Sequence, residues 1–168
     1  MGNMDENTEI IKLSNELTYQ RYVFNRSHIK EVFTKMKIPE YIALHHIATV
    51  EESSETHTGR TYLKDLAEKL QMPMPQTSKL IEHLRDLGYL VWSHDGKGRE
   101  GTYVTITEKG KKLLVEQEEA LREYYGKVFD KFGKENLIHL LNLMKQLENV
   151  MSSEIDCLDT ACYEEETE

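Results

Sequence analysis

One stretch of the sequence combines the side chains that can recognise DNA. Between residues 75 and 87, apolar residues recur at helical spacing and predict a helix whose inward face is formed by Leu80, Ile81, Leu84 and Leu87. The other face carries Glu82 together with five neutral or basic polar residues, Gln76, Thr77, Ser78, Lys79 and His83. Glutamine can pair with adenine, serine and threonine hydroxyls suit phosphates or bases, and lysine reaches guanine or phosphate. We expect these five polar residues to bind DNA, although they would also fit an ordinary solvated helix face.

A predicted β-hairpin follows this helix directly. The segments YLVWSH and TYVTIT are rich in β-branched and aromatic residues, and the turn DGKGREG between them is rich in glycine. Lys97 and Arg99 stand between the glycines of that turn. Because a narrow minor groove concentrates negative potential that attracts arginine, we expect Lys97 and Arg99 to contact DNA. The alternative for Arg99 is an ordinary charged turn residue.

Several helices must position these residues. Apolar periodicity predicts a long amphipathic helix over residues 8–35 and a second, more apolar one over 40–51, which Pro39 can open. A loop at 53–61 leads to a short helix at 62–70, which the turn QMPMP separates from the polar helix described above. Two short helices joined by a tight turn are typical of a helix-turn-helix. After the hairpin we expect a charged helix over 108–131, a break at Gly133 and a last helix.

The terminal helices carry more apolar surface than the centre of the chain can cover. In the last helix the apolar residues recur with a near-heptad spacing that favours a helical partner. Burial between two copies of the chain would cover both helices, so we expect a homodimer, with packing inside one chain as the alternative. The expected interface residues are Leu13, Leu17, Leu137, Leu140, Leu141, Met144, Leu147 and Met151.

Four short motifs occur in a characteristic order along residues 61–114. They are Leu66-Ala67, Thr77-Ser78-Lys79, Leu84-x-x-x-Gly88-Tyr89-Leu90 and Ile106-Thr107-Glu108-Lys109-Gly110. In this order they resemble the core of MarR-type winged helix-turn-helix regulators, and with the flanking helices the resemblance spans about residues 8–153. The family usually carries an Asp-x-Arg pair in its wing. Here Lys97-Gly98-Arg99 stands in that place, and Asp95 is another source of the carboxylate.

The resemblance implies a mainly α fold with a small β-hairpin. A winged helix-turn-helix core at about residues 38–106 would be flanked by dimerisation helices at about 8–36 and 108–153. Residues 1–155 would form this single domain, followed by an acidic, disordered tail at 156–168. The implied function is a transcription regulator, a repressor that binds a near-palindromic operator of double-stranded DNA as a dimer. The alternative is a winged-helix module that binds another protein and not DNA.

The net charge of −9 supports that alternative, because phosphate neutralisation supplies most of the non-specific affinity for DNA. The charge is unevenly distributed, however. Between Thr58 and Lys112 there are ten Lys and Arg against seven Asp and Glu, so the centre of the chain is basic. Between Glu154 and Glu168 there are seven acidic residues and no Lys or Arg. The acidity is therefore concentrated in the tail.

In the family that the sequence resembles, small aromatic or apolar effectors often bind between the dimerisation helices and the DNA-binding lobe. The candidate ligand-binding residues are Tyr19, Tyr22, His45 and His46, although such residues on apolar helices are often ordinary core. Because the adjacent His45 and His46 point about 100° apart on a helix, they do not form a metal-binding pair. We expect no metal or other cofactor. Cys157 and Cys162 lie among carboxylates, which disfavour a reactive thiolate and a redox switch.

Other classes of protein lack support in the sequence. There is no glycine-rich phosphate-binding loop, nucleophile elbow or HExxH motif, so we expect no enzyme. No apolar run is long enough to cross a membrane, and the acidic N-terminal residues differ from a signal peptide. We therefore expect a cytoplasmic protein.

Overall fold

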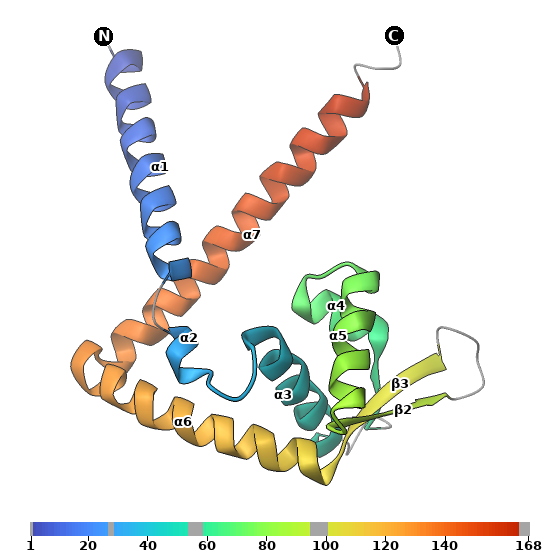
Figure 1. The fold of residues 1–168 in the computed structure, drawn as a ribbon. Helices are drawn as coiled ribbons and strands as arrows, with labels where there is room; N and C mark the ends of the chain where they lie inside the picture. Colours follow the sequence, from blue (N-terminus) through green and yellow to red (C-terminus); the bar gives the residue numbers. More distant parts are fainter. Residues whose placement is uncertain (1, 27–28, 54–58, 95–100, 165–168) are drawn as a thin grey trace. The chain divides into compact units, whose positions relative to one another are not determined.

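The computed structural model describes residues 2–26, 29–53, 59–94 and 101–164, with side chains described from residue 8 to residue 155 within these ranges. The chain forms two compact units, residues 1–120 and residues 121–168. The first unit contains helices α1 (Gly2–Arg26), α2 (Ile29–Val32), α3 (Ile38–Glu52), α4 (Leu63–Leu70) and α5 (Met74–Asp86), strands β1 (Thr61–Tyr62), β2 (Leu90–His94) and β3 (Thr102–Ile106), and the first half of α6 (Glu108–Phe132) (Figure 1). The second unit contains the rest of α6 and α7 (Lys134–Glu164). The predicted fold class, mainly α with a small β-hairpin in a winged helix-turn-helix core, is confirmed.

The sheet has one strand more than the predicted hairpin. Its antiparallel strands lie in the order β1-β3-β2, with Thr61 opposite Val104 and Trp92 opposite Val104 on the other side. From the sequence we expected residue 61 in a loop and residue 62 in a helix. That expectation is wrong because β1 has only two residues, which is too short to show the alternation of apolar and polar residues that marks a strand.

A single core holds the centre of the first unit together. It is built from buried apolar side chains of α3, α4, α5, the sheet and the first turns of α6. Its fully buried members include Leu44, Ile47, Leu66, Ile81 and Val104. Because α5 contributes Ile81 and Leu84 from one face, the core fixes the opposite face of this helix toward the surface.

The predicted helix over residues 8–35 is divided. Helix α1 ends at Arg26, and α2 occupies Ile29–Val32. The apolar residues after α1 have different partners. The carbonyl oxygen of Val32 accepts a hydrogen bond of 2.9 Å from the buried side chain of Gln117, and the ring of Phe33 meets that of Tyr41 edge-on with centroids 5.5 Å apart. Val32 and Phe33, which we expected in one helix with the residues of α1, therefore contact α6 and α3 instead.

The second unit follows the predicted break. Gly133, with a φ of +90°, lies between α6 and α7 in a left-handed conformation that favours glycine. Helix α7 then continues to Glu164, into the segment from residue 156 for which we expected disorder. The chain contains neither proline nor glycine between residues 134 and 164, so no residue in it forces an earlier end to the helix.

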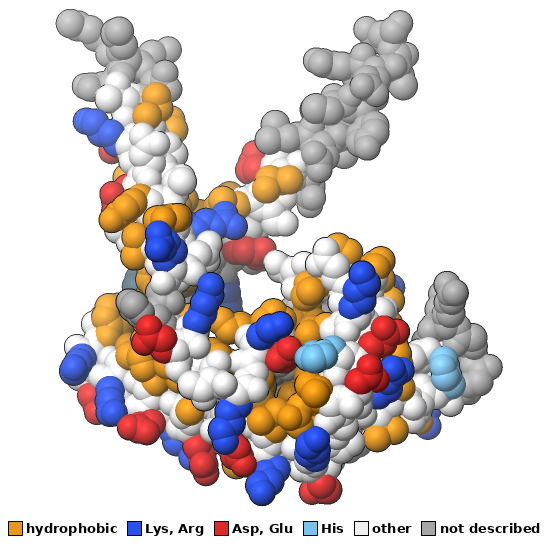
Figure 2. Space-filling view, in the orientation of Figure 1, with side chains coloured by type: hydrophobic (Ala, Val, Ile, Leu, Met, Phe, Trp, Pro, Cys, Tyr) orange, Lys and Arg blue, Asp and Glu red, His pale blue; other side chains and the backbone are white. Residues whose placement is uncertain are grey.

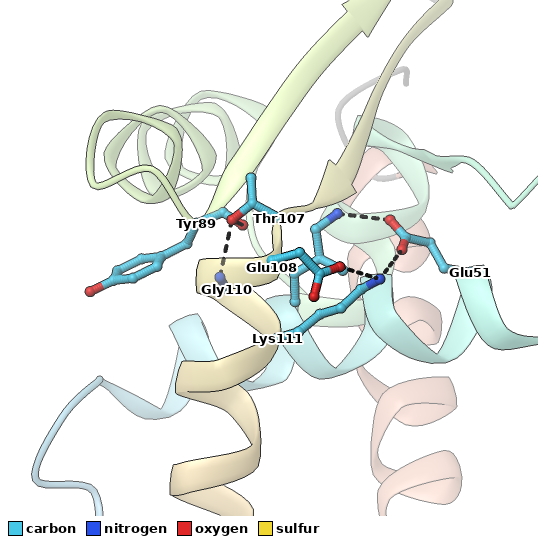
Figure 3. A network of polar contacts seen from close by, with 7 residues as sticks. Glu51, Tyr89, Thr107, Glu108, Gly110 and Lys111 are labelled. Atoms are coloured by element: carbon cyan, nitrogen blue, oxygen red, sulfur yellow. Dashed lines mark hydrogen bonds and ion pairs between the residues drawn. The ribbon is translucent and has the colours of Figure 1, made fainter.

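The start of α6 is held very close to the start of β2 (Figure 3). The Thr107 hydroxyl caps α6 by accepting a hydrogen bond of 3.0 Å from the Gly110 N–H. The Thr107 N–H donates to the Tyr89 carbonyl at 3.0 Å. A Cβ atom on Gly110 would lie 2.4 Å from the Tyr89 carbonyl oxygen and 2.8 Å from Cγ1 of Ile106. Only glycine therefore permits this approach.

The carboxylate of Glu51, at the end of α3, ties a third element to this junction. Its Oε1 accepts a hydrogen bond of 2.7 Å from the Ile106 N–H, at the end of β3. Its Oε2 lies 3.7 Å from Nζ of Lys111, which is also 3.5 Å from Oε1 of Glu108 (Figure 3). The end of α3, the end of β3 and the first turn of α6 are thus joined by one carboxylate.

We predict that Gly110→Ala destabilises the protein by more than about 2 kcal/mol, because the new methyl group meets a backbone carbonyl that cannot move independently of β2. The measurement is the free energy of unfolding by chemical denaturation. Gly126→Ala is the matched control in the same helix, since a Cβ there meets nothing within 4 Å. It should be neutral or stabilising by up to about 1 kcal/mol, because alanine favours helices. Equal stability of the two variants would contradict the close packing at Gly110.

Candidate nucleic-acid interface

Helices α4 and α5 form the predicted helix-turn-helix. The turn between them is set by Gln71, the C-cap of α4, whose φ of +50° is left-handed. The N–H of Met72 then bonds back to the Ala67 carbonyl at 3.1 Å, which closes the end of α4. Pro73 follows as the N-cap residue of α5, so that only residues 71–73 separate the two helices.

The structure corrects the predicted faces of α5 at two residues. Thr77 is fully buried, in line with Ile81 and Leu84, because intervals of four and three residues place these side chains on one helix face. Its hydroxyl lies 3.3 Å from the Pro73 carbonyl and 3.4 Å from the Met72 carbonyl, so its burial leaves no donor unpaired. The expected outward position of Thr77 is therefore wrong. Leu87, which we expected to face inward, is 42% exposed.

The other predicted residues of α5 lie at or near the surface. Gln76, Lys79 and His83 are exposed and share one helix face, since they are three and four residues apart, and Ser78 is half-buried. His83 lies at the edge of this face. Its Nε2 is 3.8 Å from Oε1 of Glu40, a buried carboxylate in the first turn of α3 that also accepts a hydrogen bond of 2.8 Å from the Lys37 N–H. We name the surface formed by Gln76, Ser78, Lys79 and His83 the α5 face.

The N-terminal tip of α5 has few N–H groups free to bind a phosphate. Pro75 has no N–H group, and the N–H groups of Gln76 and Thr77 both donate to the Pro73 carbonyl, at 2.9 and 3.0 Å. The exposed side chains at this tip are those of Met74 and Pro75, and both are apolar. The helix tip therefore offers an anion few donors, and the polar groups of this helix begin at Gln76.

The predicted wing is formed by β2 and β3. Their register ends with His94 opposite Thr102, whose side chains lie 3.0 Å apart (Nδ1 to Oγ1). Lys97, Arg99 and Asp95, which lie between the two strands in the sequence, fall outside the described residues. Strand β2 begins at Leu90, shortly after the end of α5 at Asp86, so the hairpin follows this helix as the sequence predicted.

Arg60 is a cation at the wing that the sequence alone did not predict. The guanidinium of Arg60 lies 4.6 Å from the centroid of the Tyr103 ring, and the Tyr103 ring meets that of Tyr62 edge-on at 6.2 Å. These side chains lie on the sheet face opposite to Thr61, Val104 and Trp92, because neighbouring residues of a strand point to opposite faces. The pairing of β1 with β3 brings Arg60 to the wing, and no local pattern in the sequence indicates it.

The four predicted effector residues do not form one cluster among the described contacts. Tyr19 and Tyr22 are exposed on α1, and the Tyr22 hydroxyl accepts a hydrogen bond of 2.7 Å from Arg26. The His45 ring lies 5.7 Å from that of Tyr41, and its Nε2 is 3.8 Å from Oε1 of Glu118. Within the described part of the chain, no group of three His, Cys, Asp or Glu side chains could hold a metal ion.

His46 lies on a different side of α3 from His45 and is half-buried. Burial lowers the pKa of the His46 imidazole below its usual value, and the Lys69 ammonium lowers it further. The Asp65 carboxylate opposes this change by favouring the protonated form, and His45 adds a smaller lowering effect. The fold therefore favours neutral His46.

The predicted dimer residues are largely uncovered in the single chain. On α1, Leu13 is 64% exposed, and Figure 2 shows hydrophobic side chains along this helix. On α7, the exposed residues of the predicted interface are Leu141, Met144, Leu147 and Met151. Leu137 and Leu140 are half-buried. Each of the two helices thus has apolar side chains that its own unit does not bury. No helix in the described ranges is long and apolar enough to span a membrane.

Comparisons with known proteins agree with this geometry. Residues 36–110 match the family model of a winged helix DNA-binding domain. A MarR family regulator from Neisseria meningitidis has a similar structure, with 21% identity, coverage of 93% of this chain and 98% of that chain, and a TM-score of 0.58. The Staphylococcus aureus MarR in complex with salicylate and kanamycin aligns at 16% identity over 87% of this chain and 97% of that chain, with a TM-score of 0.67.

A third similar structure is that of Bordetella bronchiseptica BpsR, whose DNA binding is regulated by 6-hydroxynicotinic acid. It has 18% identity, covers 82% of this chain and 98% of that chain, and gives a TM-score of 0.58. The sequence has no match among curated proteins. The predicted resemblance to MarR-type regulators is thus confirmed at the level of the fold.

We predict that stability falls with acid partly through His46. Because its pKa in the folded state is lowered, the unfolded chain binds the proton more readily, so His46 contributes stability above about pH 6.5 that is lost as pH falls through its folded pKa. His46→Gln should therefore flatten the decline in melting temperature between about pH 7.5 and pH 5, and Asp65→Asn should steepen it. Identical pH profiles for His46→Gln and the unmodified protein would contradict this role.

Proposed function

We propose that this winged helix protein, which has the fold of MarR family regulators, is a transcription regulator that binds DNA. The observation that carries the proposal is that α5, which bears the α5 face, packs against strand β2 of the wing sheet, within the segment that matches a winged helix DNA-binding domain. In such an arrangement the second helix of the helix-turn-helix enters the major groove and the wing meets the backbone or the minor groove. We refer to α5 as the recognition helix from here on.

Each predicted DNA-contacting residue has a separate role in this proposal. Gln76 and Lys79 reach base edges, Ser78 and His83 contact bases or phosphates at the sides of the helix, and Lys97 and Arg99 contact the minor groove or phosphates from the wing. Arg60, beside the wing, is a further candidate for a phosphate contact. Thr77 has no part in it, because it is buried.

We further propose that the regulator is a homodimer and a repressor. The exposed apolar side chains of α1 and α7 support a dimer, because a second copy would remove them from water. Two-fold symmetry then presents two recognition helices to half-sites about 34–36 Å apart, so the operator is expected to be near-palindromic. Bound there, the dimer would block transcription of the gene it controls.

A small aromatic effector would release the DNA in this proposal. 6-Hydroxynicotinic acid regulates DNA binding by BpsR, and the S. aureus MarR forms a complex with salicylate; both compounds are aromatic acids. Tyr19, Tyr22, His45 and His46 remain the candidate residues for such a molecule. An effector can shift the regulator from DNA only if it binds the two conformations with different affinity.

The first experiment is selection of duplexes from a random double-stranded DNA library by the full-length protein. Affinity for the selected duplex is then measured at several salt concentrations. A near-palindromic selected sequence and a steep fall in affinity with salt are expected, because binding releases counterions from phosphates. Enrichment of no sequence would contradict the proposal and would favour the protein-binding module that the net charge of −9 supports.

We predict that the two DNA-contacting regions respond differently to alanine. Arg99→Ala should weaken binding to selected and unrelated duplexes alike and reduce the salt slope by about one, since it removes one phosphate or minor-groove contact. Gln76→Ala should cost about 1–3 kcal/mol on the selected duplex and relax the preference at one base position. Binding titrations on both duplexes measure this. Unchanged binding by both variants would show that the assigned DNA surface is wrong.

We predict that Leu147→Glu weakens the dimer strongly, because it places a carboxylate in the apolar stripe of α7, where Leu147 is 42% exposed in the single chain. Sedimentation or light scattering at several protein concentrations measures the association. Gln146→Glu is the matched control, since it introduces the same group at an exposed position about 100° around the same helix from Leu147. A dimer of unchanged strength in Leu147→Glu would exclude this face of α7 from the interface.

A further inference from the structure

The recognition helix ends in a tight turn, and the carbonyl groups of the three residues after the helix, Leu87, Gly88 and Tyr89, accept no hydrogen bond of the helix itself. Gly88 adopts a φ of +77°, its N–H bonds to the Arg85 carbonyl at 2.8 Å, and the N–H of Tyr89 bonds to the Leu84 carbonyl at 3.0 Å. This is the hydrogen-bond pattern of a Schellman motif, which satisfies the carbonyls of the last helical turn. The carbonyls of residues 87, 88 and 89 follow it.

Each of these three carbonyls accepts a hydrogen bond from the junction between β3 and α6. The Lys109 Nζ donates to the Leu87 carbonyl at 2.7 Å, the Thr107 hydroxyl donates to the Gly88 carbonyl at 2.8 Å, and the Thr107 N–H donates to the Tyr89 carbonyl at 3.0 Å. The Lys109 Nζ also lies 4.9 Å from the centroid of the Tyr89 ring. The end of the recognition helix is therefore attached to the first turn of α6 residue by residue.

Thr107 and Lys109 differ in what else they do. Thr107 caps α6 and is half-buried, so its loss would disturb folding. Lys109 is exposed, and its long side chain reaches across to the recognition helix from the surface. Its charge also complements the negative C-terminal end of the helix dipole. Lys109 thus holds the recognition helix without belonging to the core.

We propose that Lys109 is a positioning residue for DNA recognition, and this inference rests on the proposed function. By holding the Leu87 carbonyl, it fixes the C-terminal end of the recognition helix relative to α6 and the wing, and so sets the direction in which the α5 face meets base edges. Hydrogen bonds to base edges require this alignment, whereas non-specific attraction to phosphates does not. Loss of Lys109 should therefore reduce sequence-specific binding selectively.

The test uses Lys109→Met, which keeps an unbranched aliphatic side chain and removes the ammonium group, and with it both the hydrogen bond to the Leu87 carbonyl and the contact with the Tyr89 ring. Affinity is measured for the selected duplex and for a duplex of the same composition with shuffled sequence. The expected result is a loss of about tenfold on the selected duplex, comparable to one charge-assisted hydrogen bond. On the shuffled duplex we expect less than about twofold, with an unchanged salt slope. Lys109→Arg should restore most of the specific affinity, because it keeps a charged donor.

Lys112→Met is the matched control, because Lys112 is an exposed lysine one turn further along the same helix. It should leave the ratio of specific to non-specific affinity unchanged. Equal losses on both duplexes, with a salt slope smaller by about one, would overturn the proposal and identify Lys109 as a phosphate contact. A wild-type protein that prefers no duplex contradicts the proposed function itself, whereas a wild-type preference that Lys109→Met preserves contradicts only this inference.

Discussion

The close approach of α6 to the backbone of Tyr89 is the constraint on which the arrangement of the site depends. The carbonyl of Tyr89 marks the point where the recognition helix becomes the first strand of the wing, and it receives the N–H of Thr107. A side chain at position 110 would occupy the place of that carbonyl, so glycine is required there. The same turn of α6 is joined to the end of α3 through Glu51. One short segment therefore fixes a helix, a strand and the recognition helix relative to one another.

The recognition helix is consequently held at both ends by different means. At its start, the Pro73 carbonyl accepts hydrogen bonds from the N–H groups of Gln76 and Thr77 and from the Thr77 hydroxyl. Because Pro75 has no N–H, few donors remain there for an anion. At its end, the carbonyls of residues 87–89 are held by Thr107 and Lys109. The helix between them buries Ile81 and Leu84 and leaves Gln76, Lys79 and His83 on its surface. A rigid helix with a polar outer face suits recognition that depends on side-chain position.

The sequence predicted those features that repeat along the chain. Apolar periodicity located α3, α4 and α5, Gly133 located the break between α6 and α7, and the β-branched and aromatic residues located the two longer strands. It missed β1 because two residues show no period, and it misplaced Thr77 because a polar residue on a helix is normally assigned to the solvent side. Arg60 and Lys109 act through partners more than 20 residues away, Tyr103 and Leu87 respectively, so no local pattern shows their roles. The roles assigned to the wing residues Lys97 and Arg99 are predictions from the sequence alone.

The uncovered apolar side chains of α1 and α7 have a thermodynamic consequence for the chain as a whole. Whatever covers them binds the folded state and not the unfolded one, so folding and association are linked by mass action. If that cover is a second copy, the melting temperature depends on protein concentration. A dilute sample then contains a less stable protein than a concentrated one, although every hydrogen bond within the chain is the same. The concentration of the protein would then set the stability of its own fold, as the concentration of a ligand does for a protein that binds it.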